Sequence, residues 1–323
     1  MKQVWYEWKK LISDKSVLLV VVLSMCIVLG YQWKNADSYA WQRNESYREY
    51  YEDALTTVEK MDAETARQWL QEESAWQSFL LSAAYGDSDM AFELLQMNAP
   101  EVDWNKRLKE NANEKTDIQQ TQQKYQAFTK LLERVNYAIS YAEFLESVKT
   151  QAQSMSKLSL FSDVDSFSEK NIQKTAEAYE KMNAVQPGLT YSDAADAWSD
   201  SALADVIVPG LLLFLGWAIF RKEKEAGLYQ LLGSTKRGHL EMALAKTIVY
   251  FFFAVLLAIL LYGSQIVLAI LMYGTGDMTL ALISIPSFRN CPYPISIQQY
   301  LILYLGVKVL AALFYASVIM AML

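Results

Sequence analysis

Two isolated charges lie inside otherwise apolar stretches of this sequence. Asp205 is near the start of the stretch 202–220, and Lys308 is central in the stretch 297–323, 11 residues from Ile297. A charged side chain at the centre of a bilayer costs about 3 kcal/mol on insertion scales, so Lys308 should face a partner or water. We favour packing or function over simple snorkelling, because Lys308 is far from the ends of its stretch.

The remaining residues offer little material for catalysis. The chain has one His and two Cys, which leaves little for a zinc site or a disulfide framework. It has no GxxxxGK segment, so we expect no phosphate-binding loop. The apolar stretches contain no His and no Glu, and no nucleophile–base pair stands out. We therefore predict no catalytic, metal or cofactor-binding residues, and no enzyme.

The segment 221–246 is patterned more strongly than a simple connection requires. It reads RKEKEAGLYQLLGSTKRGHLEMALAK, with six basic and three acidic residues. Acidic residues suit the N-terminus of a short amphipathic helix. A Gly-Ser-Thr break and a basic return to the membrane follow. The residues that we single out in this segment are Glu223, Glu225, Gly227, Leu231 and Arg237.

Four apolar stretches are long enough to cross a bilayer, which takes about 20 helical residues. Each holds at most one charge, so we predict an all-α, polytopic membrane protein. The first stretch follows lysines, as in a signal peptide, but no small-x-small cleavage site follows it. We therefore predict a retained anchor. The predicted spans are 17–33, 202–220, 247–273 and 297–323.

Charge predicts the orientation. Residues 1–16 carry four lysines, whereas 34–201 carries 17 Lys/Arg against 29 Asp/Glu, a net charge of −12. Basic segments stay in the cytoplasm, so we place the N-terminus and the loop 221–246 inside a cell membrane. Residues 34–201 and the loop 274–296 then lie outside. The acidic balance also excludes a basic nucleic-acid binder.

The outside domain 34–201 is predicted to be helical, because it contains only two Gly and two Pro. Its carboxylates are best interpreted as a solvated face, with a site for a cation or a cationic peptide as the alternative. The prolines of 274–296 predict an irregular loop, with re-entry into the membrane around 280–285 left open. An apolar stripe at helical spacing comprises Phe128, Leu132, Val135, Ile139 and Ala142.

Residues 1–16 predict an amphipathic helix lying in the membrane interface. The alternative is that this segment extends the first span inward. One side carries the lysines Lys2, Lys9 and Lys10, and the other side carries Val4, Trp5, Trp8, Leu11 and Ile12.

The loop 221–246 resembles the membrane subunits of type-2 ABC exporters. Their loop reads roughly E-x-x-G-x-x-x-x-L-x-x-S-T-P-x-x-R, followed by a Lys at the membrane edge. The chain departs in that Gly227 follows Glu225 by two residues and Lys236 replaces the Pro. About 140 residues share the family's order of elements, and the outside domain does not contribute. The matching residues are Glu225, Gly227, Leu231, Leu232, Ser234, Thr235, Arg237 and Lys246.

The resemblance implies a transmembrane subunit of an ATP-driven exporter. The loop would be a coupling helix that docks on a separate ABC-type ATPase, which binds the ATP. A second copy or a related permease would complete the translocation path in the lipid bilayer. Such permeases usually have six spans, so the four seen here suggest a portion of a longer protein, with a half-size subunit as the alternative. The competing hypothesis is a surface receptor or scaffold whose helical ectodomain binds a peptide or an envelope component.

Overall fold

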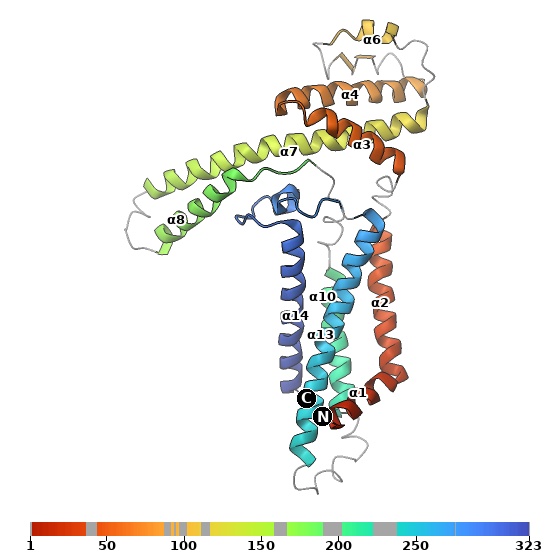
Figure 1. The fold of residues 1–323 in the computed structure, drawn as a ribbon, viewed down its shortest axis with the longest axis vertical. Helices are drawn as coiled ribbons and strands as arrows, with labels where there is room; N and C mark the ends of the chain where they lie inside the picture. The colour runs from red at the N-terminus through yellow and green to blue at the C-terminus, as the bar shows by residue number, and fades with distance from the viewer. Residues whose placement is uncertain are drawn as a thin grey trace. The chain divides into compact units, whose positions relative to one another are not determined.

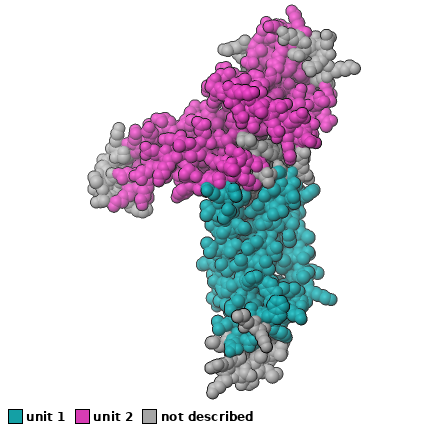
Figure 2. All heavy atoms as spheres, viewed as in Figure 1, with its two compact units in different colours: residues 1–38, 193–275, 298–323 teal, residues 39–192, 276–297 magenta. Residues whose placement is uncertain are grey.

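The computed structural model shows an all-α protein whose helices form two compact units (Figures 1 and 2). Unit 1 comprises residues 1–38, 193–275 and 298–323, and unit 2 comprises residues 39–192 and 276–297. The structure describes residues 2–36, 44–86, 92–93, 95–96, 102–110, 117–157, 167–189, 202–221, 238–274 and 276–322.

Unit 1 contains the membrane-spanning helices. Four described helices are long and apolar enough to cross a bilayer, which confirms the predicted polytopic, all-α membrane fold. The third of these helices begins at Gly238. This residue lies within the predicted loop 221–246, so the helix starts before the predicted span 247–273. The elements are α1 (Lys2–Ser13), α2 (Lys15–Ala36), α10 (Ala202–Gly216), a π-helical turn η3 (Trp217–Arg221), α13 (Gly238–Tyr273) and α14 (Ile297–Met322).

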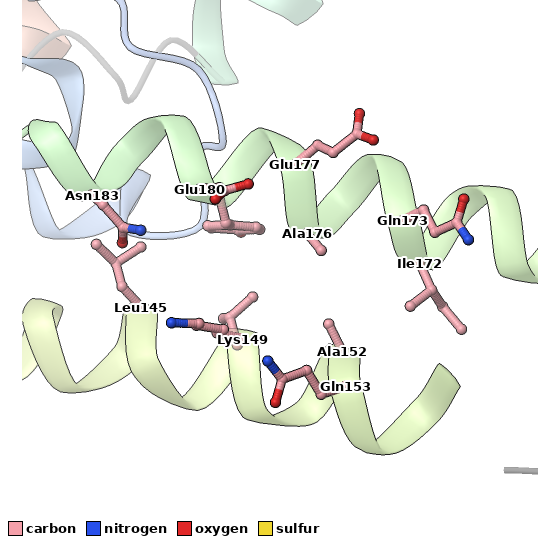
Figure 3. Close-up of a pocket in the computed structure, with 12 residues that line it drawn as sticks. Leu145, Lys149, Ala152, Gln153, Ile172, Gln173, Ala176, Glu177, Glu180 and Asn183 are labelled. Atoms are coloured by element: carbon pink, nitrogen blue, oxygen red, sulfur yellow. The ribbon is translucent and has the colours of Figure 1, made fainter. Parts of the chain in front are cut away.

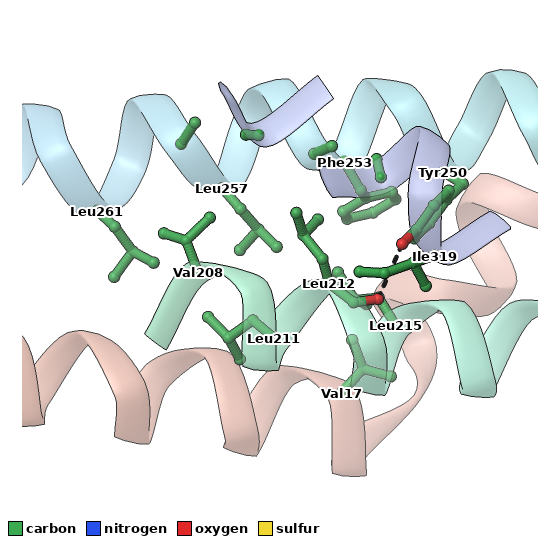
Figure 4. Packing of buried hydrophobic residues seen from close by; sticks show 14 of the residues in the cluster. Val17, Val208, Leu211, Leu212, Leu215, Tyr250, Phe253, Leu257, Leu261 and Ile319 are labelled. Carbon is green, nitrogen blue, oxygen red and sulfur yellow. Dashed lines mark hydrogen bonds between the residues drawn. The ribbon is translucent and has the colours of Figure 1, made fainter. Parts of the chain in front are cut away.

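The core of unit 1 lies where α2, α10 and α13 meet (Figure 4). Leucine side chains from α10 and α13 fill it, and Leu212 and Leu215 are fully buried. Tyr250 donates a hydrogen bond to the Leu212 carbonyl over 3.0 Å, just ahead of the π-helical turn. This bond gives the hydroxyl of a fully buried side chain a partner.

The N-terminal helix α1 is separate from α2. The carboxylate of Asp14 accepts a hydrogen bond from the backbone N–H of Ser16 over 3.0 Å, which caps the start of α2. The alternative that this segment simply extends the first span is therefore wrong.

The apolar residues of α1 divide between two faces. The Trp8 ring lies 4.6 Å from that of Phe252 and 4.8 Å from that of Phe253 on α13, measured between centroids. Trp5 and Ile12 are exposed instead. The single apolar side predicted for α1 thus combines a face that docks on the bundle with a face that stays exposed.

Unit 2 is the large helical domain, and its longest helix, α7, runs through it (Figure 1). Asn44 and Asp62 cap α3 and α4 with their side chains. The hydrogen bonds from Thr65 lower the pKa of Asp62. The elements are α3 (Glu45–Val58), α4 (Ala63–Ala84), α6 (Trp104–Glu110), α7 (Ile118–Lys157), α8 (Phe167–Glu180) and the 3₁₀ turns η2 (Lys181–Ala184), η4 (Leu282–Ser284) and η5 (Pro286–Phe288).

The buried face of α7 differs slightly from the predicted stripe. Ala127, Leu131 and Val135, spaced one turn apart, are buried against α3 and α4. Of the predicted residues, Val135 is buried in this line and Ala142 is exposed. The other three, Phe128, Leu132 and Ile139, are partly buried and pack against the same core. The face shifts because α7 is covered by different partners along its length, so no single stripe runs from end to end.

The proline-rich segment 276–297 belongs to unit 2. Tyr137 on α7 donates a hydrogen bond to the Ile283 carbonyl over 2.6 Å, and Ile283 is fully buried. Arg289 donates to the Ser140 carbonyl over 2.9 Å. The re-entrant alternative for 280–285 is therefore wrong, because this segment is part of the core of the helical domain.

Candidate functional site

Most of the predicted coupling loop lies outside the described residues. Its coupling role therefore stays a prediction. The structure describes the chain again from Gly238, where α13 begins. The singled-out residues that fall outside the described part are Glu223, Glu225, Gly227, Leu231 and Arg237.

Lys308 is described, and its partner is Asp205. The Lys308 ammonium on α14 lies 2.6 Å from one carboxylate oxygen of Asp205 on α10 and 2.8 Å from the other. Tyr262 on α13 donates its hydroxyl to the first of these oxygens over 2.6 Å. One carboxylate thus joins three membrane-spanning helices.

Two aromatic rings complete the environment of the ammonium group. Lys308 Nζ lies 5.1 Å from the centroid of the Tyr262 ring and 5.2 Å from that of the Tyr304 ring. The two rings meet edge to face, with centroids 6.2 Å apart. Cations are attracted to ring faces within about 6 Å, so both tyrosines add to the stabilisation of the charge.

The site is polar and only partly closed. The side chains of Lys308 and Asp205 are 19% and 45% exposed, and Tyr262 is buried. An unpaired charge in a span costs about 3 kcal/mol on insertion scales, and pairing offsets much of that cost. The arrangement can hold α10, α13 and α14 together. A second positively charged group that reaches the exposed side of Asp205 can also bind this carboxylate in place of Lys308.

The position of Lys308 in an apolar stretch predicts that it needs a partner, but the other members of this cluster do not follow from the sequence. Asp205 is the only charge in its stretch, and no sequence pattern singles out Tyr262 or Tyr304. The available signal was the opposite sign of two lone charges in separate apolar stretches. Tyrosine in a span carries no such signal, because it is common near membrane interfaces.

A separate groove lies in the helical domain between α7 and α8 (Figure 3). It has a volume of about 400 Å³. Leu145, Ala152 and Ala176 contribute apolar surface, and Lys149 on α7 and Glu180 on α8 contribute charged groups. This mixed lining suits a side chain or a short segment with both apolar and charged parts.

Comparisons of this chain with protein-family models, with curated proteins and with solved structures found no match.

Proposed function

We propose that this chain is the transmembrane subunit of an ATP-driven ABC exporter that works with a separate ATPase. The observation that carries the proposal is the pattern of 221–246 between two spans, with its acidic start, Gly227 and the Ser-Thr break before Arg237. In the exporters that it resembles, this loop docks on the ATPase. The proposed topology places the loop and the N-terminus in the cytoplasm, where ATP is available, and 34–201 outside the cell membrane.

The continuity of α13 supports a coupling role for this loop. The helix begins at Gly238, within the segment that carries the pattern, and continues through the span. At about 1.5 Å per residue, Tyr262 lies about 36 Å along the helix from Gly238. Lys246 is buried and Trp8 of α1 packs on α13, so α1 and this end of α13 would move as one unit. A displacement of the loop would therefore move α13 together with the Asp205 cluster.

The exposed surface of the spans supports further partners. Large apolar side chains such as Leu213, Ile302, Val307 and Phe314 are exposed on α10 and α14. We propose that lipid and a second permease, either another copy or a related chain, cover this surface. The exposed side of Asp205 would then face the translocation path that the two permeases enclose.

Charge reversal in the loop tests the proposal. The full chain is co-expressed with the ABC-type ATPase encoded nearest to its gene, and co-purification is measured. Losing one member of a partly buried charged pair should cost about 2–5 kcal/mol, which is at least about 30-fold in affinity. Arg237→Glu and Glu225→Lys should therefore weaken co-purification strongly. Lys60→Glu in the helical domain is the matched control and should not.

Arg237→Lys separates this proposal from lipid anchoring. A contact with anionic lipid is worth about 1 kcal/mol and tolerates Lys, whereas a bidentate Arg site does not. If co-purification survives both Arg237→Glu and Glu225→Lys unchanged, the loop is not the coupling element.

The α7–α8 groove favours a second candidate function, a receptor or scaffold whose helical domain binds a peptide or an envelope component. The groove is of suitable size and mixed polarity (Figure 3). This hypothesis requires no ATPase partner, so the same co-purification experiment distinguishes the two functions.

A further inference from the structure

The helical domain contains a larger cavity where α7 meets the turn between α3 and α4 and the extended segment 185–189. Its volume is about 650 Å³. Pockets for small molecules typically measure about 300–1,000 Å³ and are mostly apolar. The size of this cavity therefore suits a small organic ligand.

Short side chains keep the cavity open. Ala138 and Ala142 lie one turn apart on α7, and Ala63 and Ala66 lie on α4. Methyl groups at these four positions leave volume that larger side chains would fill. The lining is otherwise largely apolar, so an apolar ligand surface would be buried favourably there.

Hydrogen bonds hold the wall opposite α7 in place. Tyr51 donates its hydroxyl to the Leu189 carbonyl over 2.7 Å. The backbone N–H of Gly188 donates to the hydroxyl of Ser284 over 2.8 Å. Because both contacts fix the extended segment 185–189, the cavity is a built feature of the domain.

The charged residues that line the cavity in the described part of the chain are all acidic. Glu59, Glu64 and Glu143 line it, and none of its lining residues in the described part of the chain is Lys or Arg. Arg67 pairs with Glu64 over 2.7 Å. Glu59 and Glu143 are exposed, which leaves their carboxylates available to a cation.

We propose that this cavity binds a small amphiphilic organic cation. The apolar body lies beside Ala66 and Ala138, the less exposed of the four alanines, and the cationic group lies against Glu59 and Glu143. The net charge of −12 on residues 34–201 disfavours anions of the same shape. The proposal concerns the helical domain alone and holds for either function considered above.

A matched series of probes tests it on the full chain in lipid nanodiscs. Binding of 4-phenylbutylamine, 4-phenylbutanol and 4-phenylbutyrate is measured by ligand-observed NMR, with empty nanodiscs subtracted to remove partition into lipid. The amine should bind more tightly than the alcohol, and the acid should bind least. Equal affinities for the amine and the alcohol would overturn the proposal. The absence of amine binding would also overturn it, even if a cationic peptide binds.

Variants localise the binding. Glu59→Gln with Glu143→Gln should weaken amine binding about fivefold to tenfold and leave the alcohol unchanged, because exposed ion pairs contribute up to about 1 kcal/mol each. The matched control, Glu52→Gln with Glu146→Gln, removes two exposed carboxylates that do not line the cavity and should have no effect. Ala138→Phe fills the cavity and should abolish binding of both ligands. Amine binding that is insensitive to the first pair would rule out this site.

Discussion

Separating Lys308 from Asp205 provides a direct measure of the intramembrane cluster. Asp205→Asn removes the charge that faces the ammonium group, and Lys308→Met removes the ammonium group itself. The double variant removes both charges. Because the carboxylate bonds to α14 and α13 at distances of 2.6 Å, each single change should leave a charged or polar group without its partner.

The expected magnitudes follow from what each change leaves behind. Breaking a fully buried ion pair costs about 3–5 kcal/mol, but Asp205 is 45% exposed, so the cost here should be smaller. Asp205→Asn leaves Lys308 unpaired in the span, and we expect a loss of about 2–3 kcal/mol. Lys308→Met should cost about 1–2 kcal/mol, because Tyr262 still donates to the carboxylate. The double variant should be closer to wild type than the sum of both losses.

Unfolding of the purified chain in mixed micelles, titrated with SDS, measures these free energies. A coupling energy of at least about 1 kcal/mol in the double-mutant cycle would support the pair. Lys308→Arg serves as the control, since it keeps the charge and should lose less stability than Lys308→Met. Strictly additive effects of Asp205→Asn and Lys308→Met would refute the reasoning, because they would show that the two side chains do not interact.

Three further predictions concern topology, packing and pH. With both native cysteines replaced, Gln120→Cys should react with a membrane-impermeant thiol reagent in intact cells and Gln230→Cys should not; the reverse pattern would contradict the proposed orientation. Gly188→Ala should destabilise the protein by about 0.5–1 kcal/mol, seen as a slightly lower thermal unfolding midpoint, because its new Cβ would displace the flexible end of the Leu280 side chain, and adding Leu280→Ala should relieve the loss. A neutral Gly188→Ala would show that this contact is not tight. Burial raises the pKa of Tyr141 from 10.0 to about 12, so the folded state favours the neutral phenol. That contribution to stability should be complete below pH 10.0 and be lost as the pH rises to about 12. Over this window, the loss of helical circular dichroism signal should be smaller for Tyr141→Phe than for the wild type. If both proteins lose signal equally, the result would argue against the burial of this hydroxyl.

The membrane-spanning elements could be predicted because their signal is local. Apolar length alone identifies a span, and the scarcity of Gly and Pro predicts helices in 34–201. The need of Lys308 for a partner also follows from its position in an apolar stretch. Sidedness and the coupling role of Arg237 rest on sequence patterns, and they stay predictions.

The identity of each partner depended on tertiary structure. Asp205 and Lys308 are 103 residues apart, and their pairing requires α10 and α14 to be neighbours in the bundle. The segment 276–297 looked like a loop between two spans, yet Ile283 is buried in the core of the helical domain. A sequence pattern predicts which side chains must be buried and which charged side chains need an opposite charge. It does not predict which residue, distant in the sequence, contacts each of them, because that contact depends on how the helices pack.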